Sequence, residues 1–262
     1  MFSQVLTDSK KLVVLDSQKS LLKALVNASK QTSKDSDRKA LHYVHVFTNR
    51  DKDGFNWLNI NSTDAHRAFY YRTSISDHCN FDELASVDSI KAYKQGKTDK
   101  IETINTDTLE YGYPNMFRLL PSEDDLEISL QIQVFQLLPF LKAIRTSLNS
   151  ANAKNPVVDL NIEQLNDKAD IKGFTDSKIK IYVSKPNYVG FDTYGFAKLV
   201  NKSFEICFDY KYLIDALECF NKKEVVTLKF FNNPLRPFEV TTLDENRDNF
   251  YSVCLVCPVR KY

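Results

Sequence analysis

The segment Thr63-Asp64-Ala65-His66-Arg67 places a hydroxyl, a carboxylate and an imidazole close together in the sequence. These are the groups that cooperate in nucleophilic catalysis. Such catalysis also requires a strained nucleophile turn and a glycine-rich oxyanion loop, and neither pattern accompanies the segment. The chain also lacks a G-x-G-x-x-G motif and a complete glycine-rich phosphate cradle. We therefore expect a protein that is not an enzyme.

The cysteines are odd in number and scattered, which argues against a disulfide framework and for a reducing, cytoplasmic location. They are Cys79, Cys207, Cys219, Cys254 and Cys257. The last two have the C-x-x-C spacing of redox and zinc sites, but the surrounding residues read as a strand, on which positions three apart face opposite sides. No second Cys or His pair completes four ligands. We expect small apolar side chains here, with no metal and no other cofactor.

Basic side chains recur on two predicted helices. Lys19, Lys23, Lys30 and Lys34 form one stripe along a helix predicted over residues 17–34. Lys142 and Arg145 lie beside the apolar face of the third predicted helix, residues 135–151. Such stripes either bind a polyanion or are simply the solvated faces of amphipathic helices, and the pattern alone favours the solvated face.

The order helix, then alternating strands, occurs twice, and 262 residues suit two domains of ordinary size. In the first half we expect helices at 17–34 and 81–95, and strands at 41–47, 57–61, 67–75, 101–106 and 109–111. In the second half we expect helices at 135–151 and 210–220, and strands at 127–133, 157–163, 169–175, 178–184, 203–208, 225–230, 238–243 and 251–259. Strands in hairpin runs predict an α+β class, with antiparallel sheets and two helices on one face in each domain.

Three further features support these elements. Asp53-Gly54 predicts a hairpin turn within residues 48–55. The predicted apolar face of the first helix carries Leu22, Leu25, Val26 and Ser29, and that of the third carries Leu137, Leu141, Ile144 and Leu148. The acidic run Glu123-Asp124-Asp125 reads as a solvated linker.

Composition sets limits on the class of protein. Hydrophobic residues make up 43% and charged residues 26%, as in ordinary globular proteins. No apolar run is long enough to span a bilayer, and no secretory signal is evident, so we expect no membrane contact. The net charge is +1, so only a local basic face would favour nucleic acid.

Three segments resemble the bacterial DNA polymerase III β subunit, the β sliding clamp. Residues 62–68 are similar to the T-D-x-H-R-L-A segment of its middle domain. Residues 113–121 resemble the F-P-D-Y-x-R-L-I-P junction, and residues 208–217 resemble the F-N-x-x-Y-L-L-D-A-L helix of the last domain. Residues 234–237 match its P-L-x-P, and 255–260 its final strand. The resemblance implies two clamp domains, residues 1–121 and 122–262, with no counterpart of the usual first domain.

The resemblance also implies a role as a processivity factor. It implies sequence-independent binding of double-stranded DNA along the helices, and short-peptide binding to a replicative polymerase and a clamp loader. The DNA-lining candidates are Lys19, Lys23, Lys30, Lys34, Lys91, Lys94, Lys142, Arg145, Lys154, Lys211, Lys222 and Lys223. The peptide-groove candidates are Leu41, Thr63, Ala65, His66, Arg67, Ala68, Pro121, Tyr212, Leu255, Val256, Cys257, Pro258, Val259 and Arg260.

The groove assignment has a plain structural alternative. In that alternative, Leu255, Val256 and Val259 belong to a core strand, and Arg67 only pairs with an acidic neighbour. The sequence also departs from the family pattern, because Ala65 replaces Gly or Ser, Ala68 replaces Leu, and Cys257 replaces Met or Leu. The smaller Ala68 and Cys257 are expected to widen the groove.

Ring closure follows from the resemblance by arithmetic. Family rings contain six similar domains in two three-domain chains, so a two-domain chain reaches six as a head-to-tail trimer. A monomer, an open assembly, or a heteromer with a three-domain clamp stays open. The alternative function is a clamp-fold adaptor that forms no ring and competes for clamp-binding peptides.

Overall fold

The structure is a computed structural model that describes residues 11–12, 19–35, 37–76, 80–110, 112–150, 157–166, 168–183, 189–199, 203–233, 235–242 and 250–259. The chain divides into two compact units. The first unit comprises Met1–Arg118 and Asp244–Val253, and the second comprises Leu119–Leu243 and Cys254–Tyr262. The division falls after Arg118, whereas the sequence placed a boundary after Pro121.

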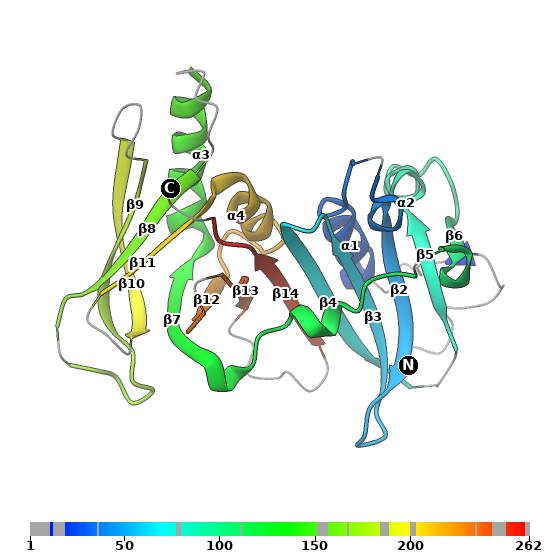
Figure 1. Cartoon of the computed structure of the whole chain (residues 1–262), viewed down its shortest axis with the longest axis horizontal. Coiled ribbons are helices and arrows are strands. Elements are labelled where there is room, and N and C mark those ends of the chain that lie inside the picture. Colours follow the sequence, from blue (N-terminus) through cyan, green and yellow to red (C-terminus); the bar gives the residue numbers. More distant parts are fainter. Residues whose placement is uncertain are drawn as a thin grey trace. The chain divides into compact units, whose positions relative to one another are not determined.

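The strands of the first unit form an antiparallel sheet (Figure 1). Their spatial order is β1 (Lys11–Leu12), β6 (Ile101–Asn105), β5 (Asp82–Ser86), β2 (Tyr43–Arg50), β3 (Asn56–Thr63) and β4 (Arg67–Ile75). Strand β4 has the bounds that the sequence predicts. The hairpin turn between β2 and β3 is also confirmed, with Gly54 at a φ of 89° and the Asp51 carboxylate accepting from the backbone N–H of Phe55.

The strands of the second unit are antiparallel as well. Their order is β13 (Phe238–Thr242), β12 (Val225–Phe231), β7 (Leu126–Gln133), β10 (Val189–Leu199), β9 (Thr175–Val183), β8 (Val157–Gln164) and β11 (Ser203–Asp209). The last strand, β14 (Phe250–Val256), is divided between the units after Val253.

Each unit carries one pair of packed helices (Figure 1). In the first unit, α1 (Lys19–Ser29) and α2 (Val87–Lys94) contact each other and strands of the sheet. In the second unit, α3 (Val134–Ser150) and α4 (Tyr210–Leu217) do the same. The described residues also form short 3-10 helices, η2 (Lys39–His42), η3 (Thr106–Thr108), η4 (Met116–Leu119) and η5 (Glu123–Asp125). The predicted α+β class is confirmed.

Apolar burial explains where the helices lie. The predicted face of α3, Leu137, Leu141, Ile144 and Leu148, is buried. Burying one such side chain stabilises the folded state by about 1.5–3 kcal/mol, so this face holds the helix on the sheet. On α1 the prediction was partly wrong. Its buried face is Leu21, Ala24, Leu25 and Ala28, whereas Leu22 and Val26 are half-buried.

Two predicted helices differ in extent. Helix α1 ends at Ser29, so Lys30 and Lys34 follow it and do not continue its stripe. The predicted helix 81–95 is instead strand β5 followed by α2, because residues 82–86 pair with β2 and β6. The Ser86 side chain then caps α2 by accepting from the backbone N–H of Ser89. Sheet pairing overrides the weak helix signal of this segment.

Three strand predictions were wrong or incomplete. Residues 169–174 form a turn instead of a strand, in which Asp170 accepts from the backbone N–H of Phe174 and Gly173 has a φ of 84°. Leu109 and Glu110 are not in a strand either. Strand β10 was missed, because Gly190 and Gly195 interrupt its alternating pattern.

The acidic run at residues 123–125 is not a solvated linker. Glu123 pairs with Lys229, whose side chain is only 7% exposed and also lies 4.0 Å from Glu239. Asp125 pairs with Arg236 at 2.9 Å, and its carbonyl accepts from the backbone N–H of Asn232. The run is therefore fixed to β12 and to the turn after it within the second unit.

An aromatic cluster holds residues 112–118 within the first unit. The ring of His45 stacks on Phe47 at a centroid distance of 4.5 Å and lies 4.8 Å from Tyr113. Phe117 contacts Phe47 and Tyr70 edge to face. The His45 Nε2 is 2.8 Å from Asp82, and its Nδ1 is buried without a hydrogen-bond partner among the described residues. Burial lowers the pKa of His45, and the Asp82 carboxylate offsets part of that shift.

We predict that this histidine makes the first unit sensitive to acid. Because its folded pKa is lowered, the unfolded chain binds more protons, and the stability present above about pH 6.5 is lost as the pH falls toward the folded pKa. His45→Phe keeps a ring in the cluster and should reduce the loss of thermal stability between neutral and mildly acidic pH. Trp57, the single tryptophan, lies in the first unit, so its fluorescence reports this transition.

His42→Phe removes a histidine outside the ring cluster and serves as the matched control. An unchanged pH dependence in His45→Phe, or an equal change in both variants, would contradict the assignment.

Candidate functional site

Positive charge gathers on the helices. The four α-helices in the described part of the chain carry seven Lys or Arg and two Asp or Glu side chains, a net charge of +5. The whole chain carries +1, so the rest of the sequence carries −4. Because the apolar faces of the helices are buried against the sheets, their charged side chains lie on the opposite faces. A helix face of this kind attracts the phosphate backbone of DNA.

The predicted cations of the first unit are exposed. Lys19 and Lys23 lie on α1, which has no acidic side chain. Lys30 and Lys34 are exposed in the segment that follows α1. Lys91 and Lys94 lie in the last turn of α2, and Lys91 pairs with Asp88 at 3.4 Å.

The predicted cations of the second unit are less uniform. Lys142 on α3 is half-buried and pairs with Glu218 at 2.7 Å, which reduces its charge toward solvent. Arg145, Lys211, Lys222 and Lys223 are exposed, and the Lys211 ammonium lies 5.9 Å from the ring centroid of Tyr210. Lys154 lies outside the described residues.

Residues 63–67, for which the sequence predicts a groove role, are held by hydrogen bonds in a tight turn between β3 and β4. The Asp64 carboxylate accepts from the backbone N–H groups of His66 and Arg67 and pairs with the Arg67 guanidinium at 2.9 Å. Arg67 also donates to the carbonyl of Lys30. The Arg67 side chain is therefore held by Asp64 and by the Lys30 carbonyl. Pairing with an acidic neighbour is what the alternative to a groove role predicts for Arg67. His66 is exposed at the tip.

Ala65 has a φ of 75°, and it is the one non-glycine residue with positive φ in the described part of the chain. This left-handed conformation costs a non-glycine residue about 1–3 kcal/mol. The Thr63 hydroxyl offsets the strain, because it accepts from the N–H of Ala65 at 3.0 Å and donates to the carbonyl of Arg67 at 2.7 Å. Leu41 is half-buried in η2, and Ala68 is buried in β4.

The second-unit segment for which the sequence predicts a groove role runs from β14 to residue 259. Leu255 and Val256 are buried, and Pro121, Tyr212, Cys257 and Pro258 are half-buried. Val259 is 36% exposed. The backbone N–H of Val259 donates to the carbonyl of Cys207, and Pro258 forms a bridge with Phe208, so this segment lies beside β11. Arg260 lies outside the described residues.

Burial separates the candidates in this segment. Leu255 and Val256 have the burial of core strand residues, whereas Val259 presents an apolar side chain to solvent.

Cys254 is buried in β14, and its thiol lies 3.7 Å from the carbonyl of Ala216. The described residues contain no group of three or more His, Cys, Asp or Glu side chains placed to hold a metal ion.

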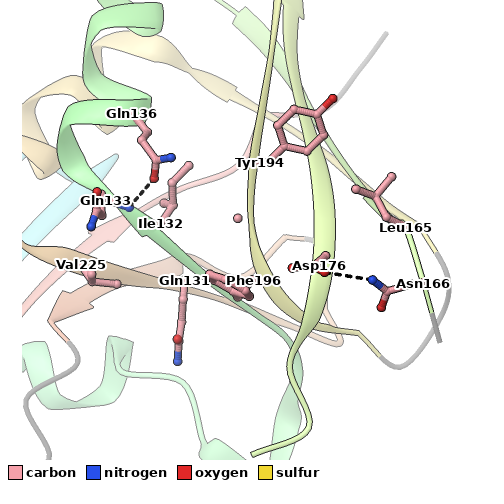
Figure 2. Close-up of a pocket in the computed structure, with 11 residues that line it drawn as sticks. Gln131, Ile132, Gln133, Gln136, Leu165, Asn166, Asp176, Tyr194, Phe196 and Val225 are labelled. Carbon is pink, nitrogen blue, oxygen red and sulfur yellow. Dashed lines mark hydrogen bonds between the residues drawn. The ribbon is translucent and has the colours of Figure 1, made fainter. Parts of the chain in front are cut away.

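A pocket of about 670 Å³ in the second unit was not predicted from the sequence (Figure 2). It lies where β7 and β10 separate, and Tyr194, Phe196 and Leu165 supply its exposed apolar surface. The pocket was missed because β10 was missed. Aromatic residues at 191, 194 and 196 were the available signal, and the glycines at 190 and 195 obscured it.

Within the described ranges, no helix is both long enough and apolar enough to cross a bilayer. No protein family model matches the sequence, and no curated protein matches it either.

Solved structures of bacterial sliding clamps match nearly the whole chain. The DNA polymerase III β chain of Streptococcus pneumoniae TIGR4 matches with a TM-score of 0.73 and 22% identity, over 98% of this chain and 67% of that one. The β subunit of Thermotoga maritima matches with a TM-score of 0.71 and 15% identity, over 98% and 67%. The Caulobacter crescentus β sliding clamp matches with a TM-score of 0.72 and 16% identity, over 100% and 67%.

The chain thus spans about two thirds of the length of these structures. At such identities the likeness concerns the fold. This chain has the fold of bacterial DNA polymerase III β sliding clamps.

Proposed function

We propose that this protein is a DNA sliding clamp that holds duplex DNA against its helices and tethers a replicative polymerase. The observation that carries the proposal is the charge separation, with +5 on four helices and −4 on the remainder of the chain. In a protein with the clamp fold, basic helices would provide the surface that holds DNA.

The physical requirement of a clamp is to attract DNA without fixing its position. Contacts between Lys or Arg and phosphate are independent of sequence, and mobile counterions are released as they form. Contacts with bases would hold the protein at one position on the DNA. Helix side chains that contact only the phosphate backbone of the DNA make no base contacts. Exposed lysines on α1 suit this task, because their long side chains follow phosphates as the duplex moves.

We predict that Lys19→Glu/Lys23→Glu weakens binding to a short duplex by tenfold or more, on the order expected for losing two phosphate contacts. The slope of log affinity against log salt should become shallower by about 0.9 for each lost contact. Fluorescence anisotropy between about 50 and 200 mM salt measures both quantities.

Lys52→Glu/Lys168→Glu makes the same charge change at two exposed lysines outside the helices and should leave binding nearly unchanged. Equal losses in the two double variants would remove the helices as the DNA-binding surface.

The proposed assembly is a closed head-to-tail trimer. Three copies of a two-unit chain supply six units, and closed rotational symmetry leaves no unsatisfied interface. Light scattering coupled to gel filtration should give a particle three times the 30.2 kDa mass of the chain. A strict monomer at micromolar concentration would contradict the ring and leave the adaptor function.

The adaptor alternative has one observation in its favour. The basic surface of the second unit is reduced, because Glu218 neutralises Lys142 and α4 carries Asp215 as well as Lys211. A clamp-fold adaptor would bind clamp-binding peptides of replication proteins without encircling DNA. An adaptor would still bind such peptides, and Lys19→Glu/Lys23→Glu would have little effect on its DNA binding.

For partner recruitment, we propose that Tyr212, Pro258 and Val259 supply the peptide contacts of the second unit. These side chains are accessible, whereas Leu255 and Val256 support them from the core. On the first unit, we propose Leu41 and the exposed tip residues Ala65 and His66 as peptide contacts, whereas the buried Thr63 and Ala68 and the hydrogen-bonded Arg67 support the turn. An exposed apolar side chain such as Val259 and a rigid turn such as residues 63–67 each suit binding of a short, partly hydrophobic peptide.

We predict that Val259→Asp weakens binding of a fluorescent peptide from the C-terminus of a replicative polymerase by about tenfold, because losing one apolar contact at an interface centre costs over 1 kcal/mol. Thermal unfolding should change little, since Val259 is 36% exposed. Leu255→Asp is unsuitable for this test, because a charge at a side chain only 3% exposed would destabilise the unit.

Leu235→Asp changes another exposed apolar side chain of the same unit and is the control. Peptide affinity that is unchanged in Val259→Asp would remove this segment from the binding site.

A further inference from the structure

The solvent face of α3 begins with an aromatic side chain. Val134, Leu137 and Leu141 are buried against the second unit, whereas Phe135 is 52% exposed. Lys142 follows Phe135 by seven residues, which is close to two full turns, so the two side chains lie on the same face of the helix. The ring therefore lies on the helix face that carries cations proposed to meet DNA.

Two exposed lysines lie beside this ring. The backbone N–H of Val134 donates to the carbonyl of Glu224, and that of Phe135 donates to the carbonyl of Lys222, each at 3.0 Å. These bonds join the start of α3 to the turn at residues 221–224, which precedes β12 within the second unit. Lys222 and Lys223 of this turn are both exposed.

The turn leaves the charges of these lysines available. The Glu224 carboxylate accepts from the backbone N–H of Asn221 at 2.8 Å and also from its side-chain amide. Neither Lys222 nor Lys223 pairs with a carboxylate in the part of the chain that the structure describes. The turn keeps a net charge of +1, and free ammonium groups attract phosphates.

The ring needs a different partner from the lysines, because a phenyl group cannot bind phosphate. In a duplex the bases stack on one another, so a side chain has little access to their faces. In a single strand the base faces are open, and stacking on aromatic side chains beside basic groups is a general way to bind it. Phe135 with Lys222 and Lys223 thus matches a single strand better than a duplex.

A peptide partner fits this surface less well. Short peptides insert their apolar side chains into hollows. The pocket of Figure 2 is lined by Gln133, Gln136 and Val225 but not by Phe135, so the ring lies outside that hollow.

We propose that Phe135, Lys222 and Lys223 form a site for single-stranded DNA, in which an unpaired base stacks on the ring and the lysines contact the neighbouring phosphates. The site rests on the proposed function, because its value lies in placing unpaired nucleotides beside a surface that holds duplex. The lysines of α1 recognise only phosphates, whereas this site distinguishes single strands from duplexes. The DNA that suits both surfaces is a duplex with a single-stranded extension.

The test is fluorescence anisotropy of the full chain with a labelled oligothymidylate and with a blunt duplex of equal length. Phe135→Ala should weaken oligothymidylate binding by about five- to a hundredfold, the range for one stacked base, and leave duplex binding nearly unchanged. Phe135→Tyr keeps the stacking surface and should bind as the wild type does. Phe55→Ala removes a ring that is 60% exposed in the first unit and is the matched control.

Two further variants separate the contributions. Lys222→Ala/Lys223→Ala should make the slope of log affinity for the single strand against log salt shallower by about 0.7 for each lost contact. In Phe135→Trp, oligothymidylate should quench the new fluorescence. The natural Trp57 is 4% exposed and lies in the first unit, so quenching beyond that of the wild type reports stacking at residue 135.

The proposal is overturned if the wild type does not bind oligothymidylate, if Phe135→Ala binds it as well as Phe55→Ala does, or if Phe135→Ala loses single strand and duplex equally. Loss of polymerase-peptide binding in Phe135→Ala would also overturn it, because the ring would then contact protein. Duplex binding that resists Lys19→Glu/Lys23→Glu, with oligothymidylate binding still lost in Phe135→Ala, contradicts the clamp function alone.

Discussion

Apolar packing of each helix pair against its sheet is the interaction on which the proposed functions depend. Leu21, Ala24, Leu25 and Ala28 fix the rotation of α1, and a longer apolar face does the same for α3. Once these faces are buried, the lysines of α1 must point away from the sheet. The basic surface is therefore a by-product of core formation, and the core sets its direction more firmly than any contact between charges does.

The sequence predicted the helices and turns whose formation depends on residues close together in the chain. Helix α3 was evident from the spacing of Leu137, Leu141, Ile144 and Leu148, and the β2–β3 hairpin from Asp53-Gly54. Strand β10 was not, because it has glycines where a strand pattern needs side chains and is held in place by β9 and β7. Strand β5 contains no glycine and was read as helix because its local pattern carries a weak helix signal. Its identity comes from neighbours distant in the sequence.

In the candidate site, a match to a motif does not determine whether a side chain is exposed. Motifs located the 63–68 turn and the 255–259 segment, but a motif does not tell which side chains face solvent. Leu255 and Val259 belong to the same matched segment, yet one is 3% and the other 36% exposed. Likewise the acidic run at 123–125 looked solvated because its cations, Lys229 and Arg236, lie more than a hundred positions away in the chain.

The left-handed backbone of Ala65 narrows the evolutionary choices at the tip of its turn. Glycine, asparagine and aspartate adopt this conformation readily, whereas valine, isoleucine and threonine are strongly disfavoured. His66, the other exposed residue at the tip, has no positive φ, so its backbone carries no such restriction. Substitution at residue 66 is therefore compatible with the turn, whereas residue 65 tolerates only side chains that accept a left-handed backbone.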